Sequence, residues 1–146
     1  MTDAEALVRR YIEEVWNRGS AASLDQLTTS AFTYHLGGQP PRDRQALADF
    51  IAATRQAFPD WRVEVDQAIA DAAMVAIRWH GRVTHRGAFH GLPPTGRAVT
   101  VTGINIYAIA GGRIDAEWEQ TDSLGLLQQL GALPDLTSAG SRRRPM

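Results

Sequence analysis

Apolar residues recur at helical spacing near the start of the chain. They fall on one face of the segment that follows Thr2, and the set comprises Leu7, Val8, Tyr11, Ile12, Val15 and Trp16. Thr2 and Glu5 fit a capping box, in which each side chain accepts a hydrogen bond from the other residue's backbone N–H. Gly19 stands where a helix would end, because glycine readily adopts the left-handed backbone that follows a last turn. These signals predict a first helix.

Two further helices are predicted before residue 60. Leu24 and Leu27 give a thin apolar edge, which indicates a short helix over residues 20–29. Asp43 is placed to cap a longer helix. The buried stripe of that helix consists of Leu47, Phe50, Ile51, Thr54 and Phe58. Between the two helices, "FTYHL" (32–36) is typical of a brief strand.

The hydrophobic period changes to two after residue 60, which is typical of strands. Trp61, Val63 and Val65 alternate with polar residues. Further strands are predicted at about 74–86, 98–109 and 113–121, with a hairpin turn at residues 111–112. A last short helix is expected to begin near Asp122 or Ser123.

The order of these elements indicates the fold class. Helices come first, a meander of long strands follows, and one short helix closes the chain, which predicts an α+β fold with a curved antiparallel or mixed sheet. Three helices on one face of a strongly curved sheet would enclose a cone able to hold one small apolar ligand. We expect a single domain over residues 1–136 and a disordered basic tail over 137–146, which contains three consecutive arginines.

Composition and charge exclude several kinds of partner and chemistry. The chain of 146 residues has a net charge of −1, so it has no positive field for nucleic acid. All 15 cationic side chains are arginine, which excludes a lysine Schiff base. Cysteine is absent, so thiol chemistry and disulfides are excluded. Without a signal peptide's pattern or a long apolar run, we expect a cytoplasmic protein with no membrane partner.

Several motifs of the last third of the chain resemble one known family. They are "GLPPTGR" (91–97), "GGRI" (111–114), Asp122 and "LLQQLG" (126–131), and their order and spacing are similar to those of the SnoaL-like polyketide cyclases. That family belongs to the NTF2-like superfamily, together with ketosteroid isomerases and limonene epoxide hydrolases. The resemblance implies an NTF2-like cone with the "GLPPTGR" segment at its mouth, although this segment could equally be a structural connection.

The resemblance also implies which residues form a site. The family's acid/base carboxylate falls on Glu119, where known cyclases carry Asp. The family's His position falls on Asn105, its Gln position on Gly103, and its early-strand Asn near Tyr34. An asparagine donates and accepts hydrogen bonds but cannot shuttle a proton as histidine does. We therefore expect Glu119 as the base and Asn105 as the donor that steadies an enolate oxygen.

The pairing of the last two strands decides whether Glu119 faces the cone. Simple two-residue pairing at the glycine turn would set Asn105 beside Trp118 and leave Glu119 on the opposite face. A three-residue turn or a β-bulge would bring Asn105 and Glu119 to the same side. Burial of Trp118 favours the first register, the resemblance favours the second, and we adopt the second. Glu117 lies on the same face as Glu119 and is an alternative base.

Other residues are candidates for substrate binding. His35 follows Tyr34 on the early strand, and Tyr107 lies on the same strand as Asn105. Trp16 and Phe89 are candidates to line an aromatic slot. Trp61 and Trp79 are candidates too, but core packing is the preferred interpretation for both. The histidines lack metal-ligand spacing, so we expect neither a metal nor another cofactor.

The sequence thus predicts a cofactor-free enzyme of bacterial secondary metabolism. It would perform acid/base chemistry on a polyketide-like or aromatic polycyclic substrate, as the resemblance implies. An isomerase, an epoxide hydrolase, a hydroxylase and a non-catalytic binder of small molecules remain alternatives. A further alternative is an assembly protein whose open sheet face, with Ile104 and Ile106, only mediates dimerisation. A homodimer is expected under most of these hypotheses, since NTF2-like sheets usually pair.

Overall fold

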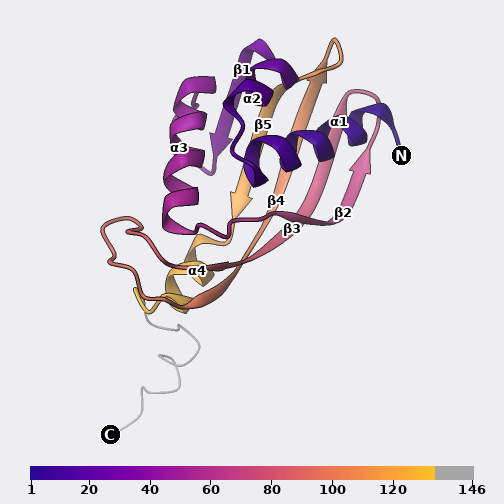
Figure 1. Ribbon diagram of the computed structural model, residues 1–146. Helices are drawn as coiled ribbons and strands as arrows, with labels where there is room; N and C mark the ends of the chain where they lie inside the picture. The colour runs from indigo at the N-terminus through magenta and orange to yellow at the C-terminus, as the bar shows by residue number, and fades with distance from the viewer. Residues whose placement is uncertain (134–146) are drawn as a thin grey trace, which may run out of the picture.

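A computed structural model describes residues 1–133 of the chain (Figure 1). Its helical elements are α1 (Asp3–Tyr11), η1 (Ile12–Asn17), α2 (Ala21–Leu27), α3 (Arg44–Ala57) and α4 (Ser123–Gln129). The predicted caps are present: the Thr2 hydroxyl accepts from the Glu5 backbone N–H at 3.0 Å, and Asp43 accepts from Ala46 at 2.9 Å. Asp122 caps α4 in the same way. The expected domain end at residue 136 and the basic tail lie outside the described residues.

The first helix does not stay regular up to Gly19. Its last turns form a π-helix, η1, in which the Arg18 backbone N–H donates to the carbonyl of Glu13. A π-turn widens the helix by one residue, and the 3.6-residue apolar period gives no sign of it. Gly19 then adopts a φ of +71°, in agreement with its expected role at the helix end. The widened segment carries Trp16, which is buried.

Five strands form one sheet. They are β1 (Thr28–Leu36), β2 (Glu64–Ala70), β3 (Met74–Thr84), β4 (Ala98–Ala110) and β5 (Arg113–Thr121). Their order across the sheet is β1-β5-β4-β3-β2. The four later strands pair antiparallel and β1 pairs parallel with β5, so the sheet is mixed, which is one of the two arrangements expected. No hairpin joins β1 to β5, because most of the chain lies between them, and their relative direction is therefore free.

A bulge sets the register of the last hairpin. Ile109 pairs with Ile114, but Ala108 pairs with Ala116, so Asp115 is the extra residue of β5. The Thr29 hydroxyl on β1 donates to the Asp115 carboxylate at 2.6 Å. Beyond the bulge, Asn105 stands opposite Glu119 and both are buried. The adopted register is confirmed, and the alternative that buried Trp118 is wrong, since that side chain is 42% exposed.

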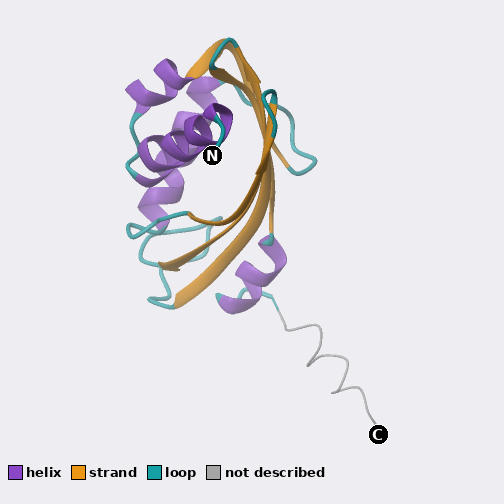
Figure 2. Cartoon of the chain, turned by 90° about the vertical axis from the view of Figure 1, so that its right-hand side faces the viewer, coloured by secondary structure: helices purple, strands orange, loops and turns teal. Residues whose placement is uncertain are grey.

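The sheet bends around the helices and encloses the core (Figure 2). Helices α1, α2 and α3 lie on its concave side, while α4 lies at one end, against β4. The core consists of inward residues of every strand and of the apolar stripes of the helices. Among residues 1–133, no helix combines the length and apolar character that crossing a membrane requires.

Candidate active site

Two carboxylates of β5 are buried inside the cone. Glu117 and Glu119 are alternate residues of one strand, so both project to the concave face, and each is at most 8% exposed. Ionised carboxylates are rarely buried unless other groups compensate for the lost hydration. The neighbours of this pair therefore decide what chemistry it can support.

Glu117 is enclosed by hydrogen-bond donors. The hydroxyls of Tyr11 and Tyr107 donate to its two oxygens at 2.6 and 2.8 Å, and the Asn105 amide donates at 3.1 Å. Burial raises the pKa of Glu117 to about 7, and the charge of Glu119 acts in the same direction. The three donors oppose this rise, because they stabilise the ionised form. Glu117 is thus held at the threshold of ionisation near neutral pH.

Glu119 is held by two hydroxyls. Tyr34 donates to one carboxylate oxygen at 2.7 Å, and Thr121 donates to the other. Burial raises the pKa of Glu119, and the two hydroxyls, the Asn105 amide and the positive charge of Arg42 oppose the rise. A carboxylate whose pKa lies above its ordinary value is a stronger base, and it accepts a proton more readily at neutral pH.

Asn105 has its amide fully engaged. The Trp79 indole N–H donates to its oxygen at 2.9 Å, while its nitrogen donates to Glu117 and lies 3.3 Å from the Tyr107 hydroxyl. The Trp79 ring can reach this position only because residue 103 is glycine. A Cβ on Gly103 would lie 2.6 Å from the ring. The indole thereby fixes the orientation of the amide.

A cavity of about 130 Å³ opens above Glu119. Its polar lining residues are Gln39, Arg42, Thr54, His90, Glu119, Thr121 and Ser123. Its apolar lining residues are Trp16, Leu36, Phe50, Phe58, Trp61, Phe89, Val101 and Leu126. A second void of about 10 Å³ lies deeper and is bordered by Asn105, Tyr107 and again Glu119. Glu119 is therefore the one carboxylate that borders both the cavity and the inner polar network.

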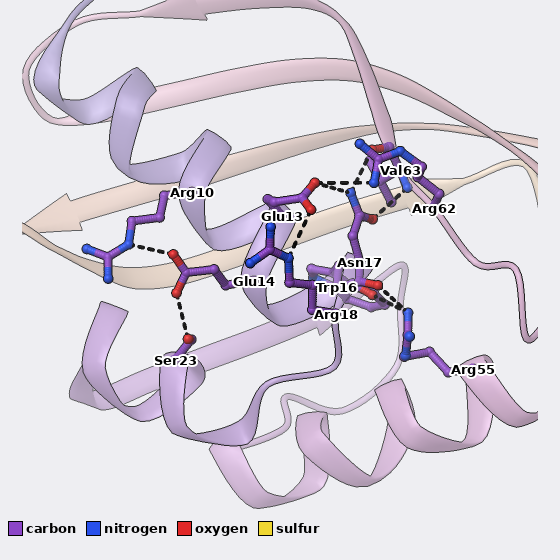
Figure 3. Close-up of polar contacts among 10 residues, drawn as sticks. All are labelled: Arg10, Glu13, Glu14, Trp16, Asn17, Arg18, Ser23, Arg55, Arg62 and Val63. Carbon is purple, nitrogen blue, oxygen red and sulfur yellow. Dashed lines mark hydrogen bonds and ion pairs between the residues drawn. The ribbon is translucent and has the colours of Figure 1, made fainter.

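Trp16 is held in the cavity wall by polar contacts on the outside of η1 (Figure 3). The Arg55 guanidinium of α3 donates to the carbonyls of Trp16 and Asn17, at 3.2 and 2.6 Å. The Asn17 side chain in turn pairs with the backbone of Val63, accepting at 2.7 Å and donating at 3.1 Å. These contacts tie the π-turn both to α3 and to the segment before β2.

The segment between β3 and β4 forms part of the cavity rim. Phe89 lines the cavity and packs edge-on against Phe58, with 5.2 Å between ring centroids. The buried His85 ring, directly after β3, accepts from the Thr95 backbone N–H at 3.1 Å. This hydrogen bond connects the later part of the segment to the end of β3. His90 adopts a φ of +48°, an uncommon conformation for a residue with a side chain. Phe89 and His90 precede the "GLPPTGR" motif (91–97), and no residue of the motif itself is among those that line the cavity.

The structure brings most of the predicted site residues together, but in separate layers. Glu119, Trp16 and Phe89 border the cavity. A second layer behind Glu119 contains Tyr34, Asn105, Tyr107 and Glu117. Trp61, expected to serve core packing alone, is half-buried and also lines the cavity.

Two predicted substrate-binding residues lie elsewhere. His35 stacks on Trp118 at 5.3 Å between ring centroids, and Trp118 is exposed on the outer face of the sheet. His35 lies on the outer face because it directly follows the inward-facing Tyr34, and successive strand residues face opposite sides of a sheet. Gly103 is covered on its inner side by the Trp79 ring and lines only a hollow of the outer face.

Some residues of the site were not expected from the sequence. Arg42 and Gln39 come from the loop between β1 and α3, and Thr121 ends β5. A loop residue carries no periodicity, so only its contacts place it in the cavity. Thr121 was detectable, because it continues the alternation of Glu117 and Glu119. In residues 1–133, no group of three or more histidine or acidic side chains is arranged to hold a metal ion.

The helices on a bent mixed sheet, with a cavity above a buried acid, define an α+β protein of the NTF2-like fold. A family model described as SnoaL-like polyketide cyclase matches residues 6–130, and the chain belongs to this family. No curated protein matches it in sequence.

Several solved structures are similar to this chain in fold. IdmH from Streptomyces antibioticus, described as a candidate polyketide cyclase, is 29% identical with a TM-score of 0.78, covering 90% of this chain and 99% of that one. A candidate polyketide cyclase from Acidithiobacillus ferrooxidans is 28% identical with a TM-score of 0.79, covering 89% and 95%. AclR from Streptomyces galilaeus, a candidate hydroxylase, shares the fold at 24% identity and a TM-score of 0.81, covering 97% and 92%.

Proposed function

We propose that the protein is a cofactor-free enzyme of bacterial secondary metabolism that moves a proton on a polyketide-like or aromatic polycyclic substrate. One observation carries the proposal: Glu119 is buried, yet it borders the cavity. Glu117 is equally buried but is enclosed by three donors of the protein itself. The base that meets a substrate is therefore Glu119.

The surroundings of Glu119 suit the removal of a proton from carbon. The poorly hydrated site raises its pKa, so the proton is accepted with less loss of free energy. Tyr34 donates to one oxygen and Thr121 to the other, and together they hold the carboxylate in place. The aromatic wall formed by Trp16, Phe50 and Phe58 suits a flat apolar substrate.

Asn105 has a positioning role in this proposal. Its amide oxygen is taken by Trp79 and its nitrogen by Glu117, and it does not border the main cavity. The expected function of Asn105 as the donor to an enolate oxygen therefore has no free N–H aimed at the substrate. We propose instead that Asn105 connects Trp79 to the carboxylate network and keeps Glu117 in place beside Glu119.

The proposal is tested by proton exchange on a simple carbon acid. The bicyclic ketone 2-tetralone exchanges the protons next to its carbonyl with D₂O, and NMR follows the loss of their signal. Wild-type protein should accelerate the exchange, and Glu119→Gln should lower the rate by about a hundredfold or more. Glu64→Gln removes a carboxylate from an exposed position of β2 and should leave the rate unchanged.

Binding without exchange would point to a different function. A thermal-shift series with aromatic polyketides reports binding independently of turnover. Ligands that stabilise wild type and Glu119→Gln equally, with no catalysed exchange in either protein, would indicate a non-catalytic binder of small molecules. We further propose a cytoplasmic homodimer formed through the outer face of the sheet, where apolar side chains such as Ile104 are exposed.

A further inference from the structure

Arg42 shares the cavity with Glu119 but does not pair with it. It carries the only arginine charge among the lining residues, and within residues 1–133 it forms no ion pair. Its guanidinium carbon lies 4.3 Å from the centroid of the Phe50 ring, and Nη2 donates to the Gln39 side chain at 2.9 Å. Its Nη1 is buried and has no hydrogen-bond partner among the described residues.

Tyr34 fixes this arginine relative to the base. The backbone of Arg42 pairs with that of Tyr34 through two hydrogen bonds, of 2.9 and 2.8 Å. The side chain of the same tyrosine donates to Glu119 at 2.7 Å. One residue of β1 thus holds the cation through its backbone and the carboxylate through its hydroxyl. The separation between the two charged groups is consequently built into the fold.

Two further donors of the cavity wall lack partners. The indole N–H groups of Trp16 and Trp61 are buried without a hydrogen bond among the described residues, and both residues line the cavity. Buried N–H groups are nearly always satisfied in folded proteins, and an unpaired one is unfavourable until an acceptor reaches it. Three residues that line the cavity therefore each have a buried N–H group without an acceptor, and they share the cavity with the carboxylate of Glu119. A ligand with an acceptor oxygen within reach of Arg42 would give that side chain a partner, whereas a hydrocarbon ligand would not.

We propose that Arg42 binds the carbonyl oxygen of the substrate, and that the substrate is a ketone or acyl compound whose acidic C–H faces Glu119. This rests on the proposed function of Glu119 as the base. The C–H bond breaks and its proton goes to Glu119, while its electron pair forms a carbon–carbon double bond. The carbonyl π electrons move to the oxygen, and Arg42 stabilises the negative charge that develops there. Return of the proton from Glu119 to carbon restores the site. Where the enolate carbon instead attacks a second carbonyl of the same substrate, a carbon–carbon bond forms, the π electrons of that carbonyl move to its oxygen, and Glu119 gives its proton to this oxygen.

Arg42 fits this task better than Asn105. A guanidinium is always charged, so it stabilises an enolate more strongly than a neutral amide does. Its free Nη1 also needs no rearrangement of the inner network, whereas Asn105 would first have to give up Glu117 or Tyr107. Donors that are already in place where charge develops contribute most to catalysis.

The inference is tested by binding of two matched probes, 2-tetralone and tetralin. They share a bicyclic skeleton, and only 2-tetralone has an acceptor oxygen. Wild-type protein should bind 2-tetralone more tightly than tetralin, and Arg42→Met should reduce this preference by roughly tenfold while affinity for tetralin is kept. Arg42→Lys retains the charge and should recover part of it. Arg113→Gln, which removes a positive charge from the exposed hairpin end, should behave as wild type.

Exchange of 2-tetralone in D₂O separates this inference from the function of Glu119. Arg42→Met should slow the exchange by about a hundredfold, and Arg42→Lys should be faster than Arg42→Met. Equal preference for 2-tetralone in wild type and Arg42→Met, with unchanged exchange, would overturn the role of Arg42 and leave Glu119 as base. Loss of exchange in Arg42→Met but not in Glu119→Gln would overturn the proposed function instead. Tetralin affinity verifies that each variant is folded.

Discussion

Glu117 and Glu119 project from the same face of β5, but only Glu119 borders the cavity. Two residues apart on one strand, they meet different surroundings. Glu117 meets two tyrosines and an asparagine amide, and Glu119 meets one tyrosine, Thr121 and open space. Pairs of carboxyl groups in unlike environments commonly divide acid and base tasks between them. This relationship makes Glu119 the group that meets the substrate, while Glu117 stays enclosed by donors of the protein itself.

Replacing Glu117 should alter how stability depends on pH. Its pKa is about 7 in the folded protein and near 4.5 when the chain is unfolded. Between these values the folded state binds more protons at Glu117 than the unfolded state, so the contribution of Glu117 to stability is greatest below about pH 4.5 and is lost as pH rises through 7. The shift corresponds to roughly 3 kcal/mol for a fully buried group. Glu117→Gln cannot titrate and should lose this part of the pH dependence.

Urea unfolding of wild type and Glu117→Gln between pH 5 and pH 8 measures the effect. The free energy of unfolding of the wild type should fall over this range by more than that of the variant. Glu64→Gln serves as the matched control, because its carboxylate is exposed and should not flatten the curve. Parallel curves for wild type and Glu117→Gln would show that Glu117 is already ionised throughout this range.

Adding one methyl group at Gly103 should disturb the hydrogen bonds of Asn105, because it would displace the Trp79 ring that donates to this amide. The new Cβ would lie 2.6 to 2.8 Å from three atoms of the Trp79 ring, which no side chain tolerates without movement. Displacing the ring breaks the Trp79–Asn105 hydrogen bond of 2.9 Å. We expect Gly103→Ala to lower the free energy of unfolding by about 1–3 kcal/mol.

Gly38→Ala is the matched control for this substitution. No atom lies within 4 Å of a Cβ at Gly38, and its φ is not in the left-handed region. Its effect on unfolding should stay within about 0.5 kcal/mol. Tryptophan fluorescence reports the second expected consequence, a changed environment of Trp79. Equal stability of the two variants would mean that β4 shifts enough to accommodate the methyl group.

The sequence pattern predicted the elements that depend on local signals. The caps at Thr2, Asp43 and Asp122 and the glycine turn of the last hairpin are signals of one to four residues, and each is present. The strand β5 was predicted with its observed bounds, although the bulge at Asp115 interrupts its alternation.

Features that depend on long-range contacts were not predictable in this way. The parallel pairing of β1 joins segments about eighty residues apart in sequence. The bulge at Asp115 allows Ile114 and Glu117 to face inward together, although they are three positions apart on the strand. Its place could be recognised only once the burial of both residues was known. Arg42 is placed at the cavity by its backbone pairing with Tyr34, and hydrophobic periodicity gives no sign of that pairing. The inward carboxylate of Glu119 was expected from the family resemblance, whereas the burial pattern alone favoured the register that would leave it on the opposite face.

The outer face of the sheet should mediate dimerisation. Strand pairing sets Ile69, Ala76, Ile106 and Trp118 side by side across four strands, and Trp118 stacks on His35 of the fifth. Ile106 and Trp118 are 41% and 42% exposed in the single chain, and a continuous apolar row of this kind marks an interaction surface. Ile106→Glu should place a charge at the centre of the row and yield a monomer. Leu124→Glu, at an exposed apolar position of α4, should leave the assembly unchanged. Light scattering after size exclusion measures both masses, and a wild type that elutes as a monomer at every concentration would rule out this interface.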